Sequence, residues 1–461
     1  MRAEAAIVKE ETGEDLKGSP TALGEENVWR LLLRFAIPSV VAMTASSLYN
    51  ITDSIFIGHG VGALALSGLA VTFPLMNLAA AFGTLVGVGA ANLMSLRLGQ
   101  RDYIAANHIL GNVVVLNLIL GVAYSAVILL SLKPILYFFG ASRQTIGYAY
   151  DYMFIITLGN AITHMYFGLN ALLRAMGKPQ KAMMNIIFSV IINVVLNPLF
   201  IYGLGWGIMG AAVATIISQA AMLASQLKFF ANKKHFIHLQ RGIFRLNRKI
   251  VADSLSIGLA PFLMNSAMSV IVILINQNLT RYGGDLAVGA YGIVNRVALL
   301  FLMVVMGLNQ GMQPIAGYNY GARQMERVNK TLLFTILLAT GVASFGFGLI
   351  QLFPRTVASA FTTDNDLIDI AAPGLQIVFL IFPLIGFQMV VSNFFQSIGK
   401  AGKAIFMSLT RQVLFLTPLL IIFPPLFGVK GVWYSIPVAD MLSSIVALYF
   451  LAQHYRDSKV R

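Results

Sequence analysis

Long apolar segments, separated by short polar connections, fill most of the chain. Runs of 18 or more residues with few or no charges are long enough for helices that cross a membrane. They are continuously apolar and do not alternate, so helices are favoured over barrel strands. We predict an all-α polytopic membrane protein with twelve spans, at 35–57, 66–94, 108–130, 148–172, 182–202, 208–229, 254–279, 287–310, 331–352, 373–396, 405–426 and 432–452.

Composition supports this class of protein. Of the 461 residues, 57% are hydrophobic and 11% are charged, whereas soluble domains carry about 25% charged residues. Residues 1–27 are polar, contain seven carboxylates and lack the features of a signal peptide. We interpret them as a cytoplasmic tail that is disordered or lies on the surface.

The distribution of the 32 Lys and Arg residues predicts the orientation. With the N-terminus in the cytoplasm, 26 of them fall on the inner side, five fall on the outer side, and Arg296 alone lies deep in a span. This bias predicts a multi-pass protein of the plasma (inner) membrane with both termini cytoplasmic. The net charge of +14 is then mostly an orientation signal, and we expect no nucleic-acid partner.

Three short motifs recur at a nearly constant offset of 221 or 222 residues. The pairs are MGKPQKA (176–182) with IGKAGKA (398–404), LGQRD (98–102) with YGARQ (320–324), and GIMG (207–210) with GVKG (428–431). They predict two six-span halves, an N-lobe at 28–250 and a C-lobe at 251–461. Because six is even, the repeat is parallel and its two-fold axis follows the membrane normal. We expect two lobes around a central cavity, with alternating access by rocking.

Asp53 is a carboxylate within the first span, in the stretch YNITDSIFIGHG (49–60). Its repeat counterpart is Ile275, so internal symmetry does not account for it. Tyr49 precedes it by one helical turn on the same face. A carboxyl group in a medium of low polarity favours its neutral form and can exchange a proton near neutral pH. Asp53 is therefore a candidate proton carrier or cation ligand, the alternative being a structural Asp with satisfied hydrogen bonds.

Other polar residues lie within spans. Asp440 in span twelve has Gln219 as its repeat counterpart, and both can serve helix–helix hydrogen bonding or a cavity. Asn193 and Asn197 in span five share a helix face, and Thr215 in span six is a further oxygen donor. For these three residues, interhelical bonding and a functional role both stay open.

Arg296 in span eight needs a partner or a route to water. Its repeat counterpart is Pro74, so it is unique to one half. One hypothesis is a cross-lobe ion pair between Arg296 and Asp53 that breaks when Asp53 is protonated. The alternatives are an Arg that extends to the interface or bonds to helix carbonyls.

Several stretches in order resemble the MATE (multidrug and toxic compound extrusion) transporters, over about residues 28–452. They are LYNITDSIFIGHGVGALALSG in span one, LRAMGKPQKAM after span four, NVVLNPLFIYG in span five and GMQPIAGYNYGA after span eight. The resemblance implies a V-shaped, two-lobed fold. It also implies efflux of bulky, often cationic and aromatic compounds, driven by inward flow of H⁺ or Na⁺.

The resemblance also implies roles for particular residues. Asp53 falls on the family's N-lobe acidic residue, which takes part in ion coupling. Tyr49, Asn193 and Thr215 fall on its neighbours in the DinF-like prokaryotic branch, and Arg296 falls on a functional span-eight Arg of part of that branch.

Two departures bear on the coupling ion. Many such members have Leu-Asp-Pro in span five, whereas this chain has Leu196-Asn197-Pro198. The NorM-like branch carries a Glu in span seven, and the stretch IGLAPFLMNS (257–266) has none. A single carboxylate favours H⁺ over Na⁺, although Asn and Thr oxygens can help coordinate Na⁺. We expect no cofactor and no bound metal beyond this coupling ion.

A further set of polar and flexible side chains is predicted to line the substrate cavity, with core packing or lipid contact as the alternative for each Met. The set is Asn77, Met264, Met303, Met306, Asn309, Gln310, Gln313, Gln388, Met389 and Asn393. The expected partners are a drug or toxic organic cation and the lipid bilayer, and we expect a monomer.

Other functions fit the sequence less well. A flippase of lipids or lipid-linked oligosaccharides from the same superfamily would favour several cations in the cavity, and only Arg296 is deep. An enzyme is disfavoured because the chain has no Cys, no metal spacing among its six His and no Walker-type phosphate loop. A channel is disfavoured because no repeated pore-lining ring occurs.

Overall fold

The computed structural model describes residues 21–459, which contain helices and no strands. The short helix α2 (Ala22–Glu25) precedes the first lobe. The N-lobe consists of α3 (Val28–Gly60), α4 (Ala63–Gly99), α5 (Tyr103–Leu130), α6 (Leu132–Phe138), α7 (Ile146–Leu158), α8 (Asn160–Ala175), α9 (Pro179–Pro198), a π-helical turn (Leu199–Gly203) and α10 (Gly207–Ala231). The C-lobe consists of α11 (Arg248–Gly321), α12 (Met325–Leu352), α13 (Pro354–Ser359), α14 (Asn365–Phe379), α15 (Phe382–Ser397), α16 (Ala401–Leu409), a π-helical turn (Thr410–Leu416), α17 (Thr417–Phe427) and α18 (Val429–Lys459).

Within the described residues, ten helices are long and apolar enough to cross a membrane. The bent pair α14 and α15, with an angle of 51°, is an eleventh candidate. The predicted span at 148–172 is formed by α7 and α8, which meet at Gly159. Spans seven and eight both lie in α11, which changes direction at Gly284 (φ 66°), a backbone conformation that glycine adopts without strain. The predicted all-α, two-lobed fold is confirmed.

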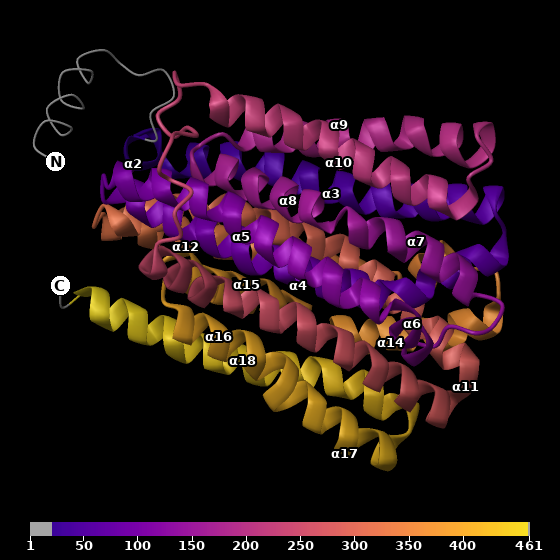
Figure 1. Cartoon of the computed structure of the whole chain (residues 1–461). Helices are drawn as coiled ribbons and strands as arrows, with labels where there is room; N and C mark the ends of the chain where they lie inside the picture. The colour runs from indigo at the N-terminus through magenta and orange to yellow at the C-terminus, as the bar shows by residue number, and fades with distance from the viewer. Residues whose placement is uncertain (1–20, 460–461) are drawn as a thin grey trace, which may run out of the picture.

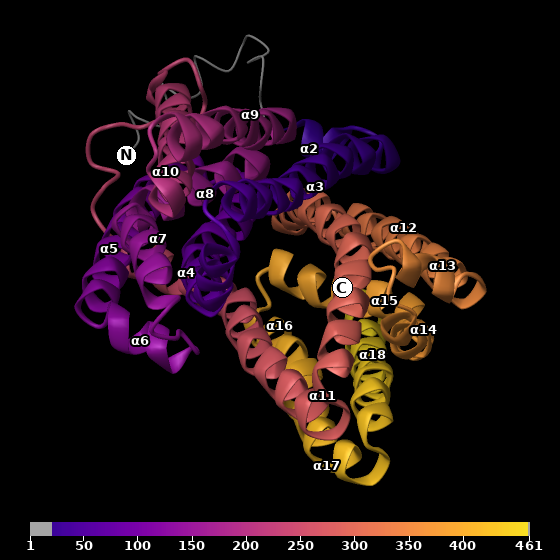
Figure 2. The same cartoon turned by 90° about the vertical axis from the view of Figure 1, so that its right-hand side faces the viewer.

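The two lobes form a V. The first and last described helices, α2 and α18, reach the same end of the molecule, which we call the termini end (Figure 1). The ribbons lie together at the termini end and spread at the opposite end, where they separate into two groups of helices (Figures 1 and 2). The residue ranges that divide the lobes stay a prediction.

The clusters of buried apolar side chains are divided between the lobes in a way that matches the V shape. One core cluster contains residues of both lobes, such as Phe35, Met94, Met312 and Phe394. Two others belong to one lobe each, around Tyr152 in the N-lobe and around Phe379 in the C-lobe. The lobes thus share one core at the termini end and have separate cores toward the opposite end.

Small residues let the two backbones touch at the termini end. A Cβ atom added to Gly99 would overlap the carbonyl oxygen of Tyr318, and one added to Gly321 would overlap the carbonyl oxygen of Leu96. These four residues pair at the repeat offset of 222, because 99 corresponds to 321 and 96 to 318. The contact is therefore reciprocal between the lobes, and a side chain at either glycine would separate them.

The basic connection between the lobes is folded onto α5. Asn112 donates to the carbonyl oxygens of Ile243 (3.4 Å) and Arg245 (3.2 Å), and Asn107 accepts from the backbone N–H of His238 at 3.1 Å. Partial burial and the positive charges of Lys181 and Lys178 lower the pKa of His235 below its usual value. The positive charge of this connection therefore comes from its Lys and Arg residues, not from His235.

Two expectations need correction. Residues 21–27 of the predicted tail are ordered, and Leu23 is buried against the C-lobe, while residues 1–20 lie outside the described residues. The inner-side total of 26 Lys and Arg residues includes Arg411, but Arg411 lies in the π-helical turn Thr410–Leu416, within a membrane-spanning segment. Arg296 is therefore not the one basic residue within the spans.

Candidate functional site

Asp53 is buried inside the N-lobe, with only 4% of its surface exposed. It lies on α3 at a position where this helix packs against α9, and the side-chain amide of Asn197 on α9 donates a hydrogen bond to its carboxyl group. Within residues 21–459, no Lys, Arg or His makes an ion pair with Asp53. An ionised carboxylate buried without a counter-ion is unfavourable, so this environment favours the neutral acid.

A chain of hydrogen bonds extends from Asp53 through the N-lobe. Asn197 also donates to Asn193 Oδ1 (2.9 Å), and Asn193 donates to Thr215 Oγ1 (3.4 Å). The Tyr49 hydroxyl donates to the same Thr215 oxygen at 2.6 Å. The structure therefore brings together the five residues predicted for ion coupling, from α3, α9 and α10.

The end of α9 has an irregular backbone beside this cluster. Pro198 follows Asn197 and has no N–H to continue the helical ladder. The chain passes from α9 into the π-helical turn Leu199–Gly203, a local irregularity that is frequent at functional sites. The side-chain oxygen of Asn197 is buried without a partner among the described residues. It is a spare acceptor next to the Asp53 carboxyl group.

Asp440 is the buried carboxylate of the C-lobe, with 1% of its surface exposed, and it is paired. Arg411 Nε lies 2.5 Å from Asp440 Oδ1. The second carboxyl oxygen of Asp440 is buried without a hydrogen-bond partner among the described residues. Its repeat counterpart Gln219 accepts a hydrogen bond from Thr163 at 2.5 Å. Both positions therefore join helices within their own lobe.

Arg296 does not pair with Asp53 in this conformation. Its side chain is exposed, and it makes no ion pair with a residue in 21–459. On α11 it lies eleven residues before Gly307, about three turns, so both point to the same side. That side faces the N-lobe, because a Cβ added to Gly307 would lie 2.6 Å from Val40 Cα on α3. Arg296 therefore faces the space between the spread lobes, while Asp53 points into the N-lobe.

The predicted cavity residues are only partly brought together. Gln313 donates to Asn393 Oδ1 at 3.2 Å, and Gln310 donates to the sulfur of Met43 on α3 at 3.2 Å. Asn309 is buried and donates to a carbonyl oxygen of its own helix. Among the others, Gln388 is buried, Asn77 is exposed, and the Met side chains are half-buried: Met264, Met303, Met306 and Met389.

Span seven has an aromatic contact near the place of the missing Glu. Phe262 on α11 packs edge-on against Phe82 on α4, with ring centroids 5.1 Å apart. This contact joins the two lobes. An apolar pair at this place offers no ligands to a cation.

Two features of the site were missed from the sequence. Arg411 lies eight residues beyond Lys403 and inside the predicted span 405–426, yet it was included in the inner-side total of Lys and Arg residues. The sequence did contain a signal for a basic partner, because a carboxyl group buried at Asp440 requires either a cation nearby or a proton. The sequence signal for burial of the segment 21–27 was Leu23, a large apolar residue in a tail that is otherwise mostly polar.

A two-lobed bundle of apolar helices, closed at one end and carrying buried polar residues between its helices, is the architecture of a membrane transporter. The MatE family model matches residues 38–199 and 260–422, one segment in each lobe. The chain belongs to this family, the MATE transporters, and the predicted resemblance is confirmed.

Solved structures of the family have the same fold. An outward-facing multidrug resistance MATE family transporter of the MOP superfamily aligns with a TM-score of 0.89 at 26% identity, covering 96% of this chain and 99% of the other. The MATE multidrug transporter DinF-BH, solved as a complex with a ligand, aligns with a TM-score of 0.87 at 36% identity, covering 93% and 96%. The multidrug export protein MepA of Staphylococcus haemolyticus is 26% identical and covers 93% of this chain and 94% of its own length. The higher identity to DinF-BH agrees with the predicted DinF-like branch.

Proposed function

We propose that the protein is a secondary active multidrug efflux transporter that exchanges H⁺ for bulky hydrophobic or cationic compounds. It acts as a monomer in the plasma (inner) membrane, with both termini in the cytoplasm. Membership of the MATE family supports transport, and the names of its relatives, among them multidrug export proteins, support multidrug efflux. The bias of Lys and Arg toward one side supports the orientation.

The observation that carries H⁺ coupling is the environment of Asp53. Its carboxyl group is buried and receives a hydrogen bond from the neutral amide of Asn197, and no cation among residues 21–459 pairs with it. The side-chain amide of Asn197 donates to the carboxyl group as a neutral hydrogen-bond donor. A bound Na⁺ requires several oxygen ligands, and Asp53 is the one carboxylate in the cluster of Tyr49, Asp53, Asn193, Asn197 and Thr215. A proton needs only the carboxylate.

In this proposal, transport depends on the change in charge of Asp53 when it takes up or releases a proton. With the lobes spread at the opposite end, which is the outer end in this orientation, a proton from outside reaches Asp53 and neutralises it. A cationic compound held between the lobes loses an attractive charge and is released. When the lobes close there and part at the termini end, Asp53 gives its proton to the cytoplasm and the ionised form binds the next cation.

The test is efflux of the fluorescent cation rhodamine 6G from proteoliposomes, with ΔpH and a Na⁺ gradient imposed one at a time. We expect efflux under ΔpH alone and none under Na⁺ alone. The variant Asp53→Asn should insert normally and lose coupled efflux. Asp151→Asn is the matched control, since it makes the same carboxyl-to-amide change in α7 outside the polar cluster.

Two outcomes would contradict the proposal. Efflux that follows Na⁺ and ignores ΔpH would overturn H⁺ coupling, and full activity of Asp53→Asn would overturn the role of Asp53. Transfer of fluorescent anionic lipids between leaflets, with no rhodamine 6G efflux, would favour the flippase function instead.

A further inference from the structure

The segment 21–27 connects the two lobes at the termini end. Leu23 is 1% exposed and belongs to the shared core. Gly24 lies against the ring of Tyr318 so closely that an added Cβ would be 2.9 Å from its Cε1 atom. The segment is thus seated on α11 of the C-lobe, although it leads directly into α3 of the N-lobe.

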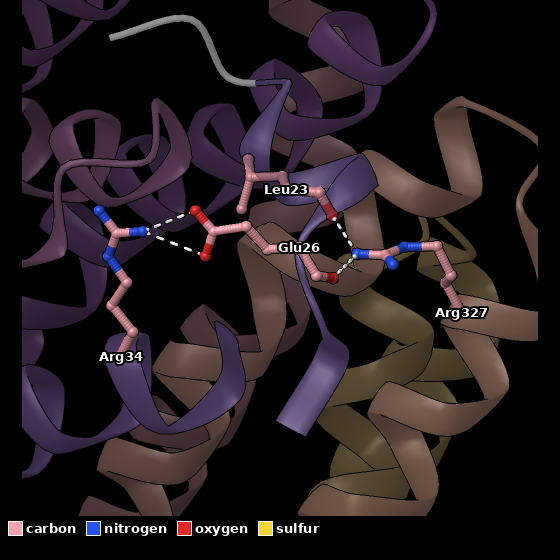
Figure 3. A network of polar contacts seen from close by, with 4 residues as sticks. All are labelled: Leu23, Glu26, Arg34 and Arg327. Atoms are coloured by element: carbon pink, nitrogen blue, oxygen red, sulfur yellow. Dashed lines mark hydrogen bonds and ion pairs between the residues drawn. The ribbon is translucent and has the colours of Figure 1, made fainter. Parts of the chain in front are cut away.

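Arg327 of the C-lobe holds the backbone of this segment (Figure 3). Its Nη2 donates to the carbonyl oxygens of Leu23 (3.1 Å) and Glu26 (2.7 Å). Its Nε donates to Asn319 Oδ1 at 2.9 Å, and Asn319 in turn donates to the Leu23 oxygen at 2.9 Å. Three of these four bonds come from a guanidinium, and bonds to charged donors are stronger than neutral ones.

The other side of the segment is fixed to α3. The Glu26 carboxylate accepts from Arg34 Nη1 at 2.8 and 3.1 Å (Figure 3). The Asn27 side chain caps α3 by accepting from the backbone N–H of Trp29 (3.0 Å) and Arg30 (3.3 Å). A displacement of α3 is therefore passed to Leu23 and Glu26, whose carbonyl oxygens Arg327 binds.

We infer that residues 21–27 are a latch that holds the termini end of the lobes closed, with Arg327 as the residue that positions it. The inference rests on the proposed function, because alternating access requires the lobes to part at this end. Parting moves α3 away from α12 and breaks the bonds from Arg327 to Leu23 and Glu26. The latch therefore stabilises the conformation in which the opposite end is spread.

The experiment measures the separation of the lobes directly. The chain has no Cys, so two introduced Cys carry the only spin labels for double electron–electron resonance. Exposed positions at the termini end are Arg241 and Gly402, and exposed positions at the opposite end are Phe138 and Leu426. Both label pairs are measured in liposomes, with and without ΔpH.

We expect Arg327→Ala to raise the ratio of open to closed populations at the termini end by about tenfold or more, because it removes charged hydrogen bonds. The opposite-end pair should shift toward its shorter distance. Lys330→Ala is the matched control and should change neither distribution, since Lys330 lies one turn further along α12 and pairs with the exposed Glu326 at 2.6 Å.

A second variant separates the latch from a role of Arg327 inside the C-lobe. Leu23→Asp cannot be buried and should release the segment, with the same shift as Arg327→Ala. Adding Arg327→Ala to it should give no further shift, because the partners have already left. An unchanged distribution in the single variants, or a full additional shift in the double variant, would overturn the latch. Failure of the unmodified sequence to open at the termini end under any gradient would instead count against the proposed transport cycle.

Discussion

Asp53 and Asp440 are both buried carboxyl groups within membrane-spanning helices, one in each lobe, but their neighbours differ. Asp440 lies 2.5 Å from an arginine nitrogen, whereas Asp53 is bound by a neutral amide. A counter-ion offsets the cost of burying an ionised carboxylate, whereas a neutral hydrogen-bond donor leaves most of that cost in place. The counter-ion, more than burial, distinguishes a structural carboxylate from an exchangeable one.

The same contrast extends to the helices around them. The N-lobe cluster has apolar counterparts at the repeat offset, and all of them lie in or against the apolar core of the C-lobe. They are Ile271 for Tyr49, Ile275 for Asp53, Phe415 for Asn193, Leu419 for Asn197 and Ile436 for Thr215. The same arrangement of helices therefore surrounds a polar cluster in the N-lobe and apolar side chains at the equivalent positions of the C-lobe.

The largest effect that would test this comparison is on stability. Asp440→Asn leaves Arg411 without its partner and should lower the free energy of unfolding by about 3–5 kcal/mol, whereas Asp53→Asn, which leaves no charge unpaired, should change it by less than about 1 kcal/mol. Thermal unfolding in detergent measures both. The double change Arg411→Met with Asp440→Leu should recover most of the loss, and equal destabilisation by the two single amide changes would contradict the distinction.

The next change sharpens the comparison by giving the N-lobe a second carboxylate. Asn197→Asp replaces the amide beside Asp53 with two further oxygen ligands, and adjacent carboxylates either share a proton or bind a cation. We expect a Na⁺ gradient without ΔpH to drive efflux in this variant and not in the original sequence. The measurement uses the same liposomes with K⁺ in place of Na⁺ as the control. No response to Na⁺ would mean that Asn197 does not determine ion selectivity.

A smaller effect is expected from the edge of the cluster. Tyr49→Phe removes the hydroxyl that donates to Thr215 at 2.6 Å, a loss of about 1–2 kcal/mol. The ΔpH-driven initial rate should fall about 5- to 30-fold, and its pH profile should move. Tyr150→Phe is the control, because Tyr150 contacts its neighbours Phe154 and Lys133 through the ring. An unchanged rate and pH profile in Tyr49→Phe would exclude it from the coupling network.

The fold followed from the sequence because hydrophobicity is the strongest signal a membrane protein carries. The predicted span 66–94 lies inside α4 (Ala63–Gly99), since a helix continues past its apolar part into more polar surroundings. Breaks inside spans were not visible. Gly159 interrupts one span although no Asp, Glu, Lys or Arg occurs between residues 152 and 173, so the sequence there predicts one continuous span.

The candidate site was predicted as a cluster, because helical spacing and the family resemblance placed Tyr49, Asp53 and Asn193 together. The Asp53–Arg296 pair could not be judged from the sequence. Whether residues of different lobes meet depends on how far the lobes have rocked, and the sequence is the same in each conformation. The pairing of Arg411 with Asp440 was not predicted either, since it joins helices that are separate in the sequence.

The reciprocal contact of Gly99 and Gly321 has an evolutionary consequence. Each half supplies both the glycine and the carbonyl oxygen that the other half needs, so the surface is complementary to itself. Isologous surfaces of this kind are the hallmark of two-fold homodimers. A single six-helix ancestor with Leu96 and Gly99 would have made the same contact with a second copy of itself. Duplication and fusion of such a dimer would join two subunits that already fit and would leave each half free to diverge away from the shared surface.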